Sequence, residues 1–160
     1  MVDYFLLKTV HILSSTLLLG TGLGTAFHGW MANRSTSLAA RRVVNRNVVL
    51  ADWLFTAPAV IVQPVTGVWL ARLAGFPLSS GWLVAAMLLY AVVGACWLPV
   101  VGIQIAMRRI ADDTPEGASL PPRYHRLARW WFALGWPAFL GVIVIFWLMT
   151  AKPELSLIHI

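Results

Sequence analysis

The sequence predicts an all-α fold, an integral membrane four-helix bundle, and three observations carry this prediction. Of the 160 residues, 59% are hydrophobic and only 11% are charged, whereas soluble domains carry about 25% charged residues. The mean hydropathy is +0.77. Four apolar segments each reach the ~20 residues that a helix needs to cross a bilayer. The chain is therefore expected to have the lipid bilayer as its immediate partner.

The spans are expected at residues 4–27, 48–73, 81–107 and 130–150. In lipid, a helix is the open-ended element that satisfies its own backbone hydrogen bonds. The first span has no small-residue cleavage site at its end, so it is interpreted as retained rather than as a signal peptide. Residues 1–153 form a single domain, and the tail at 154–160 is interpreted as an artefactual extension unrelated to the bundle.

Basic residues set the predicted orientation. Nine arginines lie in two connections, and Lys8, Arg72 and Lys152 lie on the opposite side. By the positive-inside rule, both connections are cytoplasmic and both termini lie on the outer, periplasmic side of a bacterial inner membrane. The first connection is expected to continue as an amphipathic helix, and the second, at 110–126, to be irregular. Because the net charge of +6 follows this placement, nucleic-acid binding is not expected.

A polar stripe marks the first span. Tyr4, Lys8, His11 and Ser15 follow one another at helical spacing, so the stripe is expected to face the bundle interior, because lipid offers no hydrogen-bond partners. Two further polar residues, Gln63 and Tyr90, are expected at similar depth. Together with Lys8 and His11 they are predicted to form a cofactor-binding pocket in the outer half.

His11 allows two interpretations. A histidine hydrogen-bonded to Ser15 or Gln63 would simply join helices. Alternatively, a buried imidazole suits a metal ligand, above all an axial ligand of haem b, or a proton carrier. The residue alone leaves both open.

A second polar cluster is predicted at the cytoplasmic end. It comprises His28, Asp52, Gln104 and His125. Asp52 has a structural alternative as a carboxylate at a helix amino terminus, and both histidines have one in the headgroup zone. Gly20 and Gly24 form a GxxxG pair, which is interpreted as a site of close helix packing.

Two motifs carry a family resemblance. LLKTVHILSSTLLLGTGLGTAF and VVLADWLFTAPAVIVQPVTGVWL resemble the bacterial membrane family called domain of unknown function 2269, over nearly the whole chain. That family implies no established activity. More distantly, Lys8-x-x-His11 resembles the opening helix of HemJ-type protoporphyrinogen oxidases and CopD-like copper proteins, which implies His11 as a haem ligand. No second axial ligand matches.

Three functions follow as hypotheses. The first is a haem-binding or redox-linked membrane protein that uses His11. The second is a non-enzymatic accessory subunit that contacts a membrane protein partner or a second copy of itself. The third is a small transporter that carries protons or metal along a polar stripe from His11 through Gln63 to Asp52. Whether the protein is an enzyme is left open.

Overall fold

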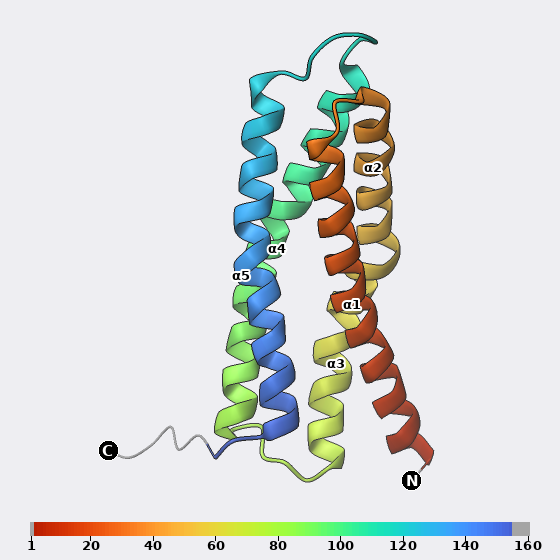
Figure 1. The fold of residues 1–160 in the computed structure, drawn as a ribbon. Helices are drawn as coiled ribbons and strands as arrows, with labels where there is room; N and C mark the ends of the chain where they lie inside the picture. The colour runs from red at the N-terminus through yellow and green to blue at the C-terminus, as the bar shows by residue number, and fades with distance from the viewer. Residues whose placement is uncertain (1, 155–160) are drawn as a thin grey trace, which may run out of the picture.

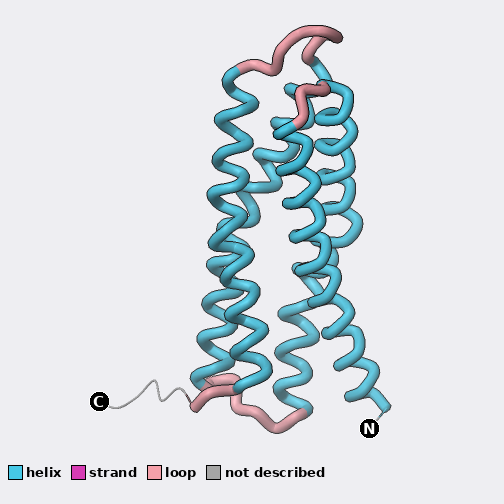
Figure 2. The backbone as a smooth tube through the Cα atoms, in the orientation of Figure 1, coloured by secondary structure: helices cyan, strands magenta, loops and turns pink. Residues whose placement is uncertain are grey.

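The computed structural model describes residues 2–154, which form a bundle of long helices (Figures 1 and 2). In chain order these are α1 (Val2–Arg34), α2 (Leu38–Ala51), the π-helix η1 (Asp52–Thr56), α3 (Ala57–Leu73), α4 (Gly81–Asp113) and α5 (Pro122–Ala151). Because α2, η1 and α3 run on without a break, the described residues form four helices that are long and apolar enough to span a membrane. This confirms the predicted membrane bundle. Residues 155–160, most of the predicted artefactual tail, lie outside the described residues.

The helices extend beyond the predicted spans at the two basic connections. The first connection is helical, as predicted, and begins with a side-chain cap in which the Ser37 hydroxyl accepts a hydrogen bond from the Ala40 backbone N–H. The prediction of an irregular 110–126 is wrong at both ends, because α4 continues to Asp113 and α5 begins at Pro122. Proline suits the first turn of a helix, where the missing N–H has no intrahelical partner anyway.

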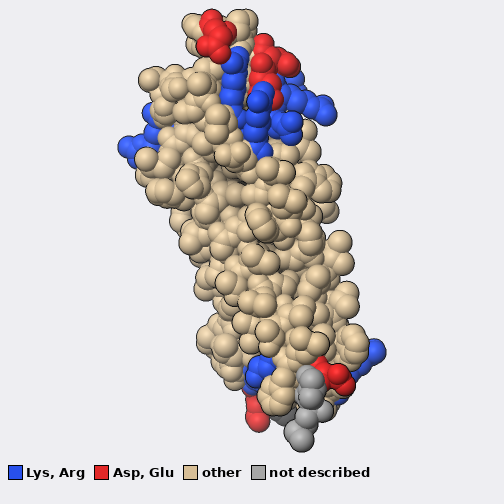
Figure 3. Space-filling view, turned by 90° about the vertical axis from the view of Figure 1, so that its right-hand side faces the viewer, with Lys and Arg blue, Asp and Glu red and all other residues tan. Residues whose placement is uncertain are grey.

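The two ends of the bundle differ in charge. Both basic connections lie at one end, here called the arginine-rich end, and the described chain termini lie at the other, the terminal end (Figure 1). On the face seen in Figure 3, most of the Lys and Arg side chains gather at the arginine-rich end, and the long surface below them carries no charged side chains until the other end. Which end faces the cytoplasm stays a prediction from the positive-inside rule.

Packing is uneven around the bundle. α5 packs mainly against α4, and α1 mainly against α3 and α2. A cluster of buried residues, including Met107, Tyr124 and Trp131, fills the arginine-rich end. A smaller cluster around Trp82 closes the terminal end.

Glycines allow close helix contact at two positions other than those predicted. A Cβ atom at Gly29 of α1 would meet the Trp131 indole of α5 at 2.5 Å, and one at Gly141 of α5 would meet Val93 of α4 at 2.5 Å. By contrast, a Cβ at Gly20 or Gly24 would meet nothing within 4 Å. The expected packing at this GxxxG pair is therefore not formed within the chain, because α1 contacts its neighbours through other positions.

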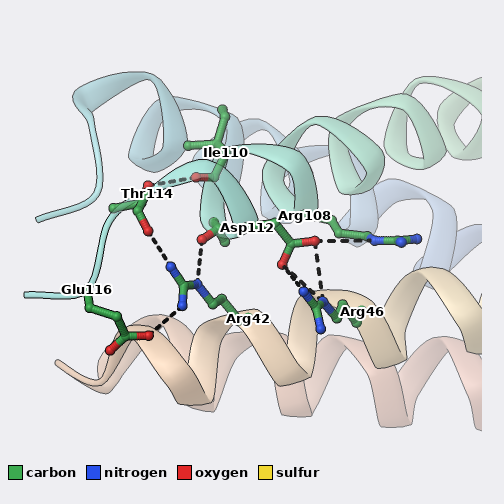
Figure 4. A network of polar contacts seen from close by, with 8 residues as sticks. Arg42, Arg46, Arg108, Ile110, Asp112, Thr114 and Glu116 are labelled. Carbon is green, nitrogen blue, oxygen red and sulfur yellow. Dashed lines mark hydrogen bonds and ion pairs between the residues drawn. The ribbon is translucent and has the colours of Figure 1, made fainter. Parts of the chain in front are cut away.

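Two arginines of α2 contact the end of α4 (Figure 4). Arg42 donates from Nε to the Ala111 carbonyl at 2.8 Å, also donates to the Thr114 carbonyl, and pairs with Glu116 at 2.7 Å. Arg46 pairs with Asp112 at 3.0 Å. The last carbonyls of a helix lack intrahelical partners, so Arg42 supplies the donors that end α4. Arg42 and Arg46 therefore also hold α2 against the end of α4, in addition to their predicted role in topology.

Candidate functional site

The terminal half of the bundle joins α1 to α3 through His11. Its Nδ1 lies 2.7 Å from the Thr66 hydroxyl, and its backbone carbonyl accepts a hydrogen bond from the Gln63 amide at 2.8 Å. Thr66 has one hydroxyl hydrogen, which it donates to the Val62 carbonyl at 2.6 Å. In a neutral His11 ring we therefore place the proton on Nδ1, from which it is donated to Thr66, and this leaves Nε2 unprotonated. The structure brings His11 and Gln63 together and adds Thr66, which sequence analysis missed.

The rest of the predicted stripe does not face the interior. Lys8 is exposed, with its ammonium 6.0 Å from the centre of the Tyr4 ring. Ser15 donates to the Ile12 carbonyl of its own helix. The buried serine is instead Ser14, which donates to the Ala59 carbonyl of α3 at 3.3 Å.

Tyr90 contributes to a different contact from the one predicted. Its hydroxyl donates to the Val60 carbonyl of α3 at 2.7 Å. Within α3, that carbonyl lacks its usual partner because Pro64, four residues later, has no backbone N–H. Tyr90 thus restores a hydrogen bond that the proline removes, as neighbouring helices do in membrane bundles.

Two members of the second predicted cluster meet inside the bundle. Asp52 of η1 is 6% exposed and Gln104 of α4 is 7% exposed, and both residues line one cavity. Thr56 donates to Asp52 Oδ1 at 2.9 Å. Within the described chain, Asp52 Oδ2 and Gln104 Oε1 have no hydrogen-bond partner.

The two histidines of that cluster lie elsewhere. His28 and His125 are both exposed, and each ring packs edge-on against the preceding aromatic residue of its own helix. The structure thus does not bring them to Asp52. Exposure in the headgroup zone, the alternative interpretation, fits both positions.

A π-helix positions Asp52. The backbone N–H of Ala57 bonds to the Asp52 carbonyl, five residues back, and Pro58 cannot donate to the Leu54 carbonyl in the α-helical manner. The wider turn adds one residue and so rotates the following helix by about 100°. As a result Asp52 and Thr56 face the bundle interior, whereas Gln63 faces α1. Single π turns are frequent at functional sites.

Asp52 and Gln104 lie at one wall of a cavity of about 360 Å³. Small-molecule sites have volumes of ~300–1,000 Å³. The remaining wall is almost entirely apolar and rich in aromatic rings, which are Phe27, Trp30, Tyr90, Trp97, Trp131, Phe132, Trp136 and Phe139. Trp97 and Trp136 therefore line a cavity, which their positions along the sequence alone did not distinguish from packing.

The cavity reaches the outer surface between α1 and α5. Its lining includes Leu23 and Phe27 of α1, and Phe132 and Trp136 of α5, and all of these side chains are also exposed. Because these residues belong to two of the candidate membrane spans, we expect the opening to face lipid.

The predicted pocket of Lys8, His11, Gln63 and Tyr90 does not form as one cavity. Of these residues, only Tyr90 lines the cavity. Within the described chain, no histidine, methionine or cysteine lines it, and no group of three or more His, Cys, Asp or Glu side chains is placed to hold a metal. The cavity therefore does not fit a histidine-ligated haem, and His11 lies outside its lining.

A comparison with protein families gives one match. The model of the family described as predicted integral membrane protein (DUF2269) matches residues 5–153. No curated protein and no solved structure matches the chain.

Proposed function

Because this chain belongs to the DUF2269 family of predicted integral membrane proteins, we propose that it works inside the bilayer as a binding protein for a small amphipathic molecule. The molecule enters between α1 and α5 and places its polar group at Asp52 and Gln104. One observation carries the proposal. Asp52 and Gln104 line an otherwise apolar cavity, and each has a buried oxygen, Asp52 Oδ2 and Gln104 Oε1, without a hydrogen-bond partner among the described residues.

The energetics favour a ligand at this position. A buried acceptor without a hydrogen bond costs about 1–3 kcal/mol, and native structures leave few such groups. An ionisable side chain inside a membrane span carries a further free-energy cost. A ligand with a hydrogen-bond donor offsets these costs at Asp52 and Gln104, while its apolar part fills the aromatic cavity.

Filling the cavity is expected to abolish binding. Gly22 lines the cavity, and a Cβ there meets nothing within 4 Å, so we expect Gly22→Phe to take up part of the cavity volume. We expect the purified protein to bind one equivalent of decylamine or decanol, counted by native mass spectrometry, and Gly22→Phe to weaken binding of both at least ~10-fold.

Gly20→Phe is the matched control. Gly20 lies on the same helix and has equal room for a side chain, but it does not line the cavity. Wild-type affinity is expected in this variant. Saturable binding that survives Gly22→Phe, or no saturable binding in the wild type, would overturn the proposal.

Haem ligation at His11 is a second candidate, and the free lone pair on Nε2 favours it. Thr66 holds the Nδ1–H, as a second group commonly does for a metal-bound histidine. His11 would then be one axial ligand, and the haem would supply redox chemistry. On this candidate, haem added to the purified protein gives a Soret band that His11→Ala removes and His125→Ala keeps. A spectrum of free haem in the wild type excludes it.

The sequence also suggested a transporter and an accessory subunit as functions. The transporter hypothesis relied on a polar stripe through Gln63, but Gln63 turns toward α1 and does not line the cavity that holds Asp52. An accessory role with a membrane partner or a second copy stays a prediction, as does a bacterial inner-membrane location.

A further inference from the structure

We infer that the cavity selects a lipophilic cation, an amine whose ammonium group lies at Asp52 and whose apolar tail lies between α1 and α5. This inference rests on the proposed binding function and names the chemical class of the ligand. It combines three features of the site: acceptors without donors, a carboxyl group without a basic neighbour, and aromatic walls.

The buried polar atoms that lack a partner beside the cavity are acceptors. Thr56 already donates to Asp52 Oδ1, and the two atoms without a hydrogen-bond partner among the described residues, Asp52 Oδ2 and Gln104 Oε1, are both oxygens. A ligand that pairs with both of them brings hydrogens. A primary ammonium carries three donors, enough to reach both oxygens, and a bond between an ion and its acceptor is about twice as strong as a neutral one.

The carboxyl group of Asp52 also lacks a positive neighbour. The ion pairs of the described residues join Arg42 to Glu116, and Arg46 and Arg108 to Asp112, all at the arginine-rich end (Figure 4). Charged side chains inside membranes usually pair with one another. Since none of these arginines reaches Asp52, a cationic ligand supplies the missing charge.

Aromatic rings complete the site for a cation. Trp97 and Trp131 line the same cavity as Asp52, and Trp131 is only 7% exposed. The face of an indole attracts an ammonium group, and it does so more strongly when water is excluded. A carboxylate together with tryptophan faces favours an amine over an alcohol of the same length.

Decylamine and decanol distinguish the classes, because they share the tail and differ in charge. Binding is measured by native mass spectrometry in detergent without lipid, so that anionic headgroups cannot attract the amine. We expect wild-type protein to prefer decylamine at least ~10-fold. In Asp52→Asn, which keeps the shape of the side chain, the two affinities are expected to become equal. Asp112→Asn, outside the cavity, keeps the preference.

The possible results distinguish failure of the proposed binding function from failure of the inference that the ligand is a cation. If neither compound binds saturably, the proposed function fails. If both bind with equal affinity to the wild type, the binding function holds and the inference of a cation is overturned, without any variant being needed. If Asp52→Asn keeps the full preference, the cation lies elsewhere, which also overturns the inference.

Discussion

Replacing Arg42 with methionine is expected to lower the free energy of unfolding by about 2–4 kcal/mol. The change keeps the apolar stem but removes the donors to the carbonyls of Ala111 and Thr114. Ala111 is fully buried and Thr114 is nearly so, so water cannot replace the lost hydrogen bonds. Unfolding of the purified protein in mixed micelles, followed by circular dichroism against the SDS fraction, measures the change.

Two control variants separate capping of α4 from the ion pair. Glu116 is 85% exposed, and exposed ion pairs contribute about 0–1 kcal/mol, so Glu116→Gln is expected to have little effect. Arg109→Met, at an exposed position of α4, is expected to be neutral as well. A loss in Glu116→Gln as large as in Arg42→Met would contradict the role assigned to the buried carbonyls.

Gly29→Leu is expected to destabilise the protein by roughly 1–3 kcal/mol, the usual cost of overpacking. Even the first carbon of a side chain at this position would lie 2.5 Å from the Trp131 indole, and that ring is rigid and buried. The structure can respond only by moving α1 away from α5. The same SDS titration measures the loss.

Gly20→Leu provides the comparison on the same helix. This variant also replaces a glycine of α1 with leucine, but a Cβ at Gly20 meets nothing within 4 Å. Helix propensity alone therefore predicts that the free energy of unfolding stays the same or rises slightly. Equal stability of the two variants would show that the contact between Gly29 and Trp131 does not hold α1 against α5.

The architecture could be predicted because membrane physics leaves few choices. A bilayer requires long apolar helices, and composition alone identified four of them. The helix ends were harder to predict. Arg42 and Pro122 extend α4 and α5 into the second connection, and the first of these effects depends on a contact between residues 69 positions apart, which the sequence does not display.

Only part of the site could be predicted, because the sequence does not show how far each helix is rotated about its axis. Periodicity assumes 3.6 residues per turn, and the π turn at Asp52–Thr56 breaks that assumption between Asp52 and Gln63. Residue type was a better guide, since Asp52 and Gln104 were both identified and do meet. The aromatic wall was missed as a site, because tryptophans in a membrane protein are also expected at its interfaces.

The neighbouring residues Arg41 and Arg42 have a consequence for biosynthesis. Arg41 bonds to carbonyls of Ala32, Asn33 and Ser35, only 6–9 residues earlier, so its contacts form as soon as the ribosome has made α2. The partners of Arg42 come 69–74 residues later. At about 5–20 residues per second, the partners of Arg42 are synthesised roughly 4–14 s after Arg42 itself. We therefore expect the contacts between α1 and α2 to form during translation, before the second half of the bundle packs against them.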